Sequence, residues 1–193
     1  MGRSFRVALV IGLVLGSGGV AMGAAQPGGS EAEMREELQQ ALWPADIVRL
    51  SNAYVGRYPQ GPGAAHARAA LKLAERSKRT LERKEVHLYR GDFQIDSAMP
   101  ETREQIRLAA LGDKEAALEV ARFHGSGSGG VARDMNRYVG WLQYATALGN
   151  GAASYELALH YRREDQPALA APYEARAEEL GYRAPPSLDH VRK

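Results

Sequence analysis

The chain has 193 residues, with 25 Lys and Arg against 23 Asp and Glu and a formal net charge of +2. This near balance argues against a protein that holds nucleic acid by bulk electrostatics, which requires a strongly cationic surface. The chain contains no cysteine, which excludes disulfides, thiolate metal sites, a cysteine nucleophile and lipid attachment through cysteine. A chain of this length forms one compact domain or a short array of repeats.

Residues 1–25 have the features of a secretory signal peptide. Arg3 and Arg6 precede an apolar stretch over residues 7–15, and small residues allow cleavage after Gly23 or Ala25. Such a segment is removed on export, and the apolar stretch is short for a membrane span. The alanine-, glycine- and arginine-rich composition is typical of bacteria. We therefore expect a periplasmic or secreted bacterial protein without stable membrane insertion after cleavage; an uncleaved anchor is the alternative.

Residues 26–30 are expected to form a flexible linker, and residues 31–100 an N-terminal helical region. Apolar residues recur at helical spacing in its first part: Trp43, Ile47, Leu50, Tyr54 and Val55. Two prolines and two glycines at residues 57–63 end that helix. Residues 64–90 are predicted to form a second helix with an apolar stripe of Ala67, Ala70, Leu71, Ala74, Leu81 and Leu88. The two helices predict an αα-hairpin.

The second of these helices is basic. Residues 64–90 contain eight Lys or Arg against three Glu. The excess of positive charge suits an anionic partner, but glutamates at short spacing also suit a solvated face with ion pairs. We expect the solvated face.

Residues 91–102 are predicted to be a loop, with Pro100 opening the next helix. Three later helices end in Leu-Gly, at Gly112, Gly149 and Gly181. A glycine just past the last apolar residue is typical of a left-handed helix cap. We therefore place helix ends at these three positions.

The sequence between these glycines repeats. A shift of 37 places Gly112 on Gly149, and the helix that follows also matches: Ala116 on Ala153, Glu119 on Glu156, Val120 on Leu157, Ala121 on Ala158 and His124 on Tyr161. A shift of 32 aligns the next helix: Trp141 on Tyr173, Ala145 on Ala177 and Leu148 on Leu180. The length difference falls in the turn between the helices, as is usual in helical repeats. The pattern predicts an all-α fold, an α-solenoid of antiparallel helix pairs.

Residues 101–183 resemble Sel1-like repeats, which are relatives of the tetratricopeptide repeat. The first unit carries the resemblance at Ala116, Val120, Ala121, His124, Gly127, Gly129, Val131, Asp134, Arg137, Trp141, Ala145 and Gly149. It departs from the family pattern in Val120 for Leu, Ala121 for Gly, His124 for Tyr, Tyr138 for Ala, and the extra Gly130. The second unit lacks the glycine turn. Residues 49–75 are similar to a divergent tetratricopeptide-type pair, and residues 184–193 form a C-terminal tail.

The matched positions predict structural roles. Small residues allow close helix approach: Ala116, Ala121, Ala145, Ala153 and Ala177. Trp141 and Tyr173 fill the space between pairs, and Asp134 caps the second helix by accepting from the Arg137 amide. Pro172 lies near the start of the last helix, opposite Gly140, where proline is tolerated.

No residue is assigned to catalysis, to a cofactor or to a metal. Gly125, Gly127 and Gly130 have G-x-G-x-x-G spacing, but a dinucleotide loop must follow a strand, and a helix is expected here. The histidines His66, His87, His124, His160 and His190 show no metal-ligand spacing. Ser126, Ser128 and Ser154 lack a nucleophile elbow, and Asp92 and Asp96 are expected to be solvated. Tyr138, Tyr144, Tyr155, Tyr161 and Tyr173 are expected to divide between packing and exposed anchors.

The resemblance implies a non-catalytic adaptor or scaffold that binds an unidentified protein partner. Two alternatives remain open. One is a module that binds peptidoglycan or exopolysaccharide, which would need exposed aromatic residues along the concave face. The other is a hydrolase of β-lactamase type, against which the missing cysteines and missing Ser-x-x-Lys count.

Overall fold

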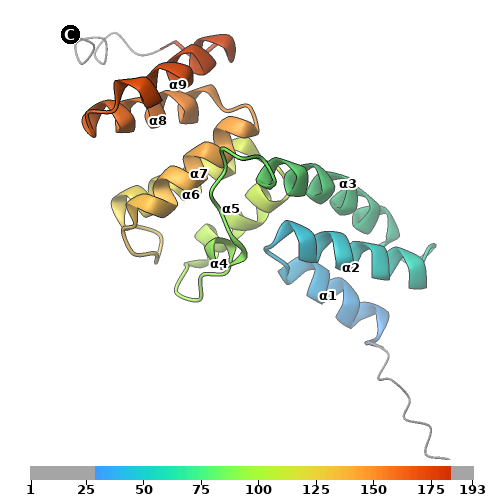
Figure 1. Ribbon diagram of the computed structural model, residues 1–193. Helices are drawn as coiled ribbons and strands as arrows, with labels where there is room; N and C mark the ends of the chain where they lie inside the picture. The colour runs from blue at the N-terminus through green and yellow to red at the C-terminus, as the bar shows by residue number, and fades with distance from the viewer. Residues whose placement is uncertain (1–28, 184–193) are drawn as a thin grey trace, which may run out of the picture.

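The computed structural model describes residues 29–183, and every regular element in that range is a helix (Figure 1). The helices are α1 (Glu31–Gln40), α2 (Pro44–Arg57), α3 (Ala64–Leu81), α4 (Arg90–Phe93), α5 (Pro100–Ala110), α6 (Lys114–Ser126), α7 (Met135–Ala147), α8 (Gly151–Arg163) and α9 (Pro167–Glu179). The expected all-α class is confirmed. The predicted signal peptide, most of the linker and the C-terminal tail lie outside the described residues.

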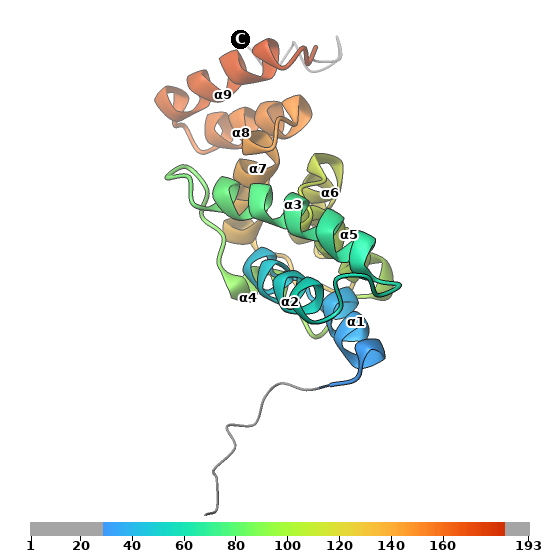
Figure 2. The ribbon, with the colours of Figure 1, turned by 90° about the vertical axis from the view of Figure 1, so that its right-hand side faces the viewer.

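Helix α1 lies at one end of the molecule and α9 at the other, with the remaining helices between them (Figures 1 and 2). Contacts are most extensive within the pairs α2–α3, α6–α7 and α8–α9, and α5–α6 and α7–α8 join successive helices. One cluster of buried residues extends from Leu38 in α1 to Leu157 in α8.

The first helical stretch is interrupted before Trp43. Ser30 caps α1 in a capping box with Glu33, so this end of the predicted linker has a defined structure. Pro44 then opens α2, where a missing amide is tolerated. Trp43 therefore precedes α2 instead of lying within a helix, and its ring packs edge-on against Phe93 at 5.1 Å.

The turn between α2 and α3 lies where the prolines and glycines predict it. The Tyr54 hydroxyl donates to Glu31 and accepts from the Gly63 amide at 2.9 Å. A side chain at Gly63 would collide with that hydroxyl, which explains the glycine there. The predicted hairpin of these two helices is confirmed by their contact.

The predicted helix over residues 64–90 is wrong beyond Leu81. Residues 82–89, called here the crossing segment, leave α3 through a turn and then run extended over α7. Val86 and Leu88 point into the core, whereas His87 and Tyr89 point outward. This alternation is that of an extended chain, and burial of two apolar side chains outweighs the helical preference of the preceding lysines and glutamates.

Gly140 in α7 makes room for the crossing segment. A Cβ atom at this position would lie 2.6 Å from the His87 carbonyl oxygen and 2.9 Å from Leu88 Cδ2. Next to it, Gln143 Oε1 accepts the His87 amide at 3.1 Å and faces His87 Nδ1 at 3.0 Å. The segment therefore rests directly on the backbone of α7.

The expected loop at residues 91–102 contains the short helix α4 and buries Phe93. The Phe93 ring lies 4.6 Å from that of Trp141 and 6.1 Å from that of Tyr144. Two ion pairs fasten this region from outside, Arg137–Asp92 at 3.1 Å and Arg90–Asp46 at 2.8 Å. The aromatic cluster joins the N-terminal helices to α7.

The bounds of the last four helices agree with the predicted shifts. Helices α6 and α8 begin at 114 and 151 and end at 126 and 163, a shift of 37 at both ends. Helices α7 and α9 are likewise related by 32. Gly112, Gly149 and Gly181 all have positive φ, and each amide donates to the carbonyl three residues before it. These are the predicted glycine caps.

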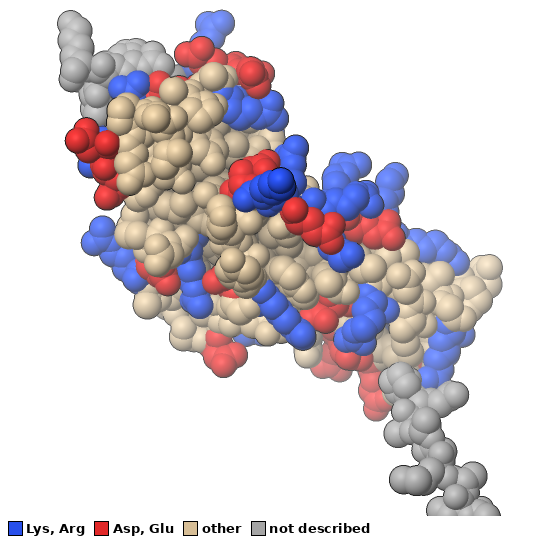
Figure 3. All heavy atoms as spheres, viewed as in Figure 1, with Lys and Arg blue, Asp and Glu red and all other residues tan. Residues whose placement is uncertain are grey.

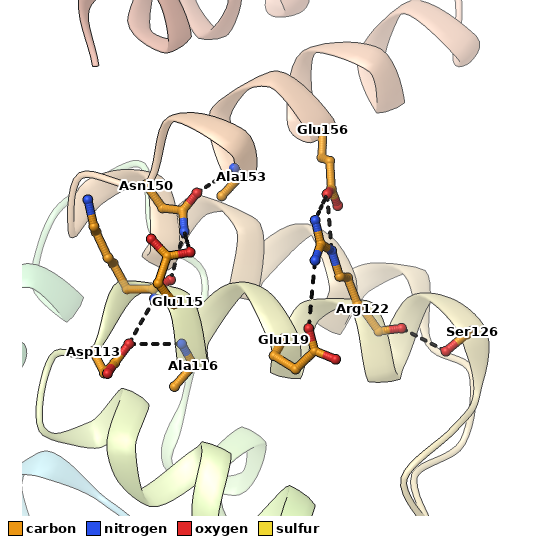
Figure 4. A network of polar contacts seen from close by, with 10 residues as sticks. Asp113, Glu115, Ala116, Glu119, Arg122, Ser126, Asn150, Ala153 and Glu156 are labelled. Carbon is orange, nitrogen blue, oxygen red and sulfur yellow. Dashed lines mark hydrogen bonds and ion pairs between the residues drawn. The ribbon is translucent and has the colours of Figure 1, made fainter. Parts of the chain in front are cut away.

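Side-chain caps and ion pairs connect equivalent helices (Figure 4). Asn150 caps α8 through the Ala153 amide and donates to Glu115 at 2.9 Å. Arg122 of α6 pairs with Glu119 of its own helix and with Glu156 of α8. Glu119 and Glu156 occupy equivalent positions under the shift of 37. Arg122 therefore bridges the equivalent carboxylates of α6 and α8.

Most of the predicted packing roles are confirmed. The five alanines are buried and Trp141 is fully enclosed, while Tyr173 stacks on Tyr161 at 5.7 Å. Asp134 accepts from the amides of Asn136 and Arg137 at 3.0 and 3.1 Å. Pro172 differs from expectation, because α9 begins at Pro167 and Pro172 lies beyond its first turn.

Candidate functional site

The glycine-rich stretch after α6 is a structural turn. The amides of Gly127 and Ser128 both donate to the Phe123 carbonyl, and the Val131 amide donates to that of Ser128. The Gly129 carbonyl accepts from the Met99 amide and the Thr102 hydroxyl. The turn follows a helix and uses these groups to hold the start of α5, so the geometry of a dinucleotide loop is not present.

The histidines are dispersed as the sequence suggests, with one exception. His66 is exposed on α3 and His124 is buried in α6, whereas His87 and His160 line the same hollow. Within residues 29–183, no group of three or more potential metal ligands forms, and His190 lies outside that range. Burial lowers the pKa of His124, while the backbone of Ala132 acts in the opposite direction.

The serines and aspartates of interest are engaged locally. The Ser126 and Ser154 hydroxyls donate to the backbone carbonyls of Arg122 and Tyr173. Asp92 accepts from the Tyr89 amide at 2.7 Å and pairs with Arg137. Asp92 is thus a structural anchor for α4, contrary to the expectation that it is merely solvated.

Two hollows lie side by side along α7. The first has a volume of about 550 Å³ and the second about 500 Å³, and Gln143 lines both. We call them together the α7 groove. The crossing segment walls it on one side, and α8, α9 and the turn between them wall it on the other. The first hollow is lined by His87, Tyr89, Met135, Asn136, Val139, Gly140, Gln143, His160, Glu164 and Gln166. The second is lined by Arg83, Glu85, Gln143, Thr146, Ala147, Leu169, Pro172, Tyr173 and Arg176.

Exposed apolar side chains gather at this groove. Of the five large hydrophobic side chains exposed within residues 29–183, three line it: Tyr89 at 71%, Leu169 at 50% and Met135 at 38%. In Figure 3 the surface over α8 and α9 is largely uncharged, whereas acidic and basic side chains crowd over α3. Exposed apolar side chains with a polar surround are typical of a protein-binding surface.

The tyrosines differ from the expected division between packing and exposure. Tyr144 and Tyr155 are buried, and Tyr138, Tyr161 and Tyr173 are half-buried with packed rings. Tyr89 is instead the exposed aromatic residue of the described chain. Residues 86–89 alternate between apolar and more polar side chains. This alternation is the sequence signal that could have placed Tyr89 on the surface. Tyr89 also lines a third hollow, of about 320 Å³, beside Trp43 and Leu81. Its side chain therefore borders both the first hollow and the third.

No protein-family model, curated protein or solved structure matches the chain. Within the described helices, none has the length and apolar composition needed to cross a membrane.

Proposed function

We propose that the chain is a non-catalytic adaptor of the bacterial envelope, a short α-solenoid of the Sel1-like type that binds a partner protein in the α7 groove. The single observation that carries the proposal is the gathering of Tyr89, Met135 and Leu169 at this groove. Helical repeats use extended concave surfaces of this kind to bind other chains. The export signal predicted at residues 1–25 supports the envelope location.

A protein partner is favoured over a glycan by the character of the groove. A glycan-binding surface needs several aromatic rings in a row. Within residues 29–183, Tyr89 is the only exposed side chain among the Phe, Trp and Tyr residues. The groove instead combines aliphatic side chains with amides and charged groups, which suits a polypeptide.

A hydrolase receives little support. The Ser126 and Ser154 hydroxyls are bonded to backbone carbonyls, and neither lies beside a base that would activate it. The sequence also contains no Ser-x-x-Lys.

Site-specific crosslinking in the envelope tests the proposal. A photoreactive residue at Tyr89 or Leu169 should give an adduct with the same defined protein, and the purified partner should form the adduct again with the purified chain. Leu73 is the matched control, because it is comparably exposed but lies on α3 away from the groove. Adducts at Leu73 alone would contradict the groove assignment. Retention on isolated cell wall without any protein adduct would favour the glycan alternative.

A further inference from the structure

We propose that the second hollow of the α7 groove receives an extended segment of a partner protein in which an apolar side chain stands beside a carboxylate. This inference rests on the proposed function and specifies the chemistry of its ligand. It is carried by the floor, the wall and the rim of the hollow.

The floor of the second hollow contains two polar side chains, Gln143 and Thr146. Gln143 is 6% exposed and its Oε1 atom accepts from His87, so its amide nitrogen is the group with which it can meet a ligand in the hollow. The Thr146 hydroxyl, at the same hollow, is buried and lacks a partner among the described residues. A buried group of this kind is stabilised when a ligand supplies the missing hydrogen bond. A backbone carbonyl is the acceptor that suits the Gln143 amide.

Gln143 already binds one extended segment. Its oxygen accepts the amide of His87, where the crossing segment runs extended over α7. A second extended chain on the other side of Gln143 would meet the amide nitrogen with its own carbonyl. The side-chain amide would then bridge two extended backbones, one from this chain and one from the partner.

The wall of the hollow is apolar. Leu169 and Pro172 are exposed on α9, and Tyr173 is half-buried beside them. Together with Ala147 they line the hollow next to the Gln143 amide. Burial of an aliphatic or aromatic side chain against this wall stabilises a bound segment in proportion to the apolar area covered.

The rim carries two guanidinium groups against one carboxylate. Arg83 lies at one side and Arg176 at the other, and Glu85 is the only acid among the lining residues of this hollow. The present ion pairs are exposed, Arg83–Glu85 at 3.5 Å and Arg176–Glu179 at 3.0 Å. Exposed pairs of this kind contribute little, and the further bond that Arg83 donates to the Ala147 carbonyl at 3.2 Å is also exposed, so either guanidinium can turn to a carboxylate that arrives beside the apolar anchor. Arginine binds carboxylates with two parallel hydrogen bonds.

Selection from a random-peptide display library against the purified chain tests this chemistry. We expect enrichment of peptides that have Asp or Glu next to Leu, Met or Phe. An enriched peptide, labelled and measured by fluorescence anisotropy, should bind about tenfold more weakly to the Arg83→Gln/Arg176→Gln double variant. Leu169→Ala should also weaken binding, whereas Arg79→Gln and Leu73→Ala on α3 are the matched controls and should leave it unchanged.

A changed peptide separates direct contact from an indirect effect. Replacing its acid with the corresponding amide should reproduce the loss seen with the double variant, and combining the two changes should add little more. Circular dichroism checks that every variant keeps its helical content.

The outcomes distinguish this inference from the proposed function. Enriched peptides that lack an acid but still require Leu169 would overturn the inference and leave the groove as the binding site. Peptides that bind equally well to Leu169→Ala and the arginine double variant would overturn both.

Discussion

The substitution Gly140→Ala tests whether the crossing segment is held directly on the backbone of α7. Alanine in a helix is favoured over glycine by about 1 kcal/mol, so helix propensity alone predicts a more stable protein. The added Cβ atom would however lie 2.6 Å from the His87 carbonyl oxygen. This oxygen belongs to backbone whose amide is bonded to Gln143, so it cannot move without the segment.

The collision is expected to outweigh the gain in propensity. Overpacking of a closed site costs about 1–3 kcal/mol, which leaves a net loss of up to about 2 kcal/mol in the free energy of unfolding. Urea denaturation followed by circular dichroism measures this as a lower midpoint with an unchanged slope.

Gly56→Ala is the matched control. Gly56 also lies in a helix, near the end of α2, but nothing lies within 4 Å of the Cβ atom it would gain. The same substitution should therefore stabilise the protein there, by up to about 1 kcal/mol. A Gly140→Ala variant that is as stable as Gly56→Ala would refute the close contact between the crossing segment and α7.

Four further changes have expected signs. Asp134→Ala should lower the free energy of unfolding by about 1 kcal/mol, and Asp134→Asn by less, because asparagine also caps a helix; urea midpoints compare them. Gly129→Ala should destabilise, because φ is positive and the new Cβ atom would meet the Thr102 hydroxyl; thermal unfolding followed by circular dichroism measures this, and an unchanged midpoint would contradict it. Because burial lowers the pKa of His124, the unfolded chain binds more protons, and stability should fall as pH falls below 6.5; in His124→Phe, urea titrations at several pH values should show less of this loss. Burial raises the pKa of Tyr144 to about 12, so stability should fall as pH rises above 10, and Tyr144→Phe should lessen this dependence in alkaline unfolding.

The helix ends were predictable because their signals are local. Gly112, Gly149 and Gly181 follow the last apolar residue of a helix, and each adopts the left-handed conformation expected of it. Asp134 precedes a helix and caps it. These signals depend on a few neighbouring residues, so the shifts of 37 and 32 could be read without knowledge of the tertiary contacts.

The crossing segment could not be predicted from the same signals. Residues 78–85 are rich in Lys, Arg and Glu, which favour helix in isolation. The chain leaves the helix because Val86 and Leu88 are buried against elements distant in sequence, an effect that propensity does not contain. The alternation of Val86 and Leu88 with polar neighbours covers only a few residues. It is therefore a weaker signal than the long helical pattern that precedes it.

The α7 groove is formed by residues that lie still farther apart in the sequence. Its two sides come from the crossing segment, near residue 83, and from α9, near residue 176. Leu169 and Tyr89 both look like ordinary helix residues in the sequence. Only their place in the fold makes both exposed along the same groove, Tyr89 at the first hollow and Leu169 at the second.

The position of the groove follows from one difference between the two related helix pairs. Gly140 of α7 and Pro172 of α9 are equivalent under the shift of 32, yet they meet different surroundings. At Gly140, the absence of a side chain lets an extended segment of the same chain lie on the helix. At Pro172, the corresponding face of α9 is exposed and lines the second hollow. Helix α7 thus shows how an extended segment is bound by this helix face, and the equivalent face of α9 lines the second hollow.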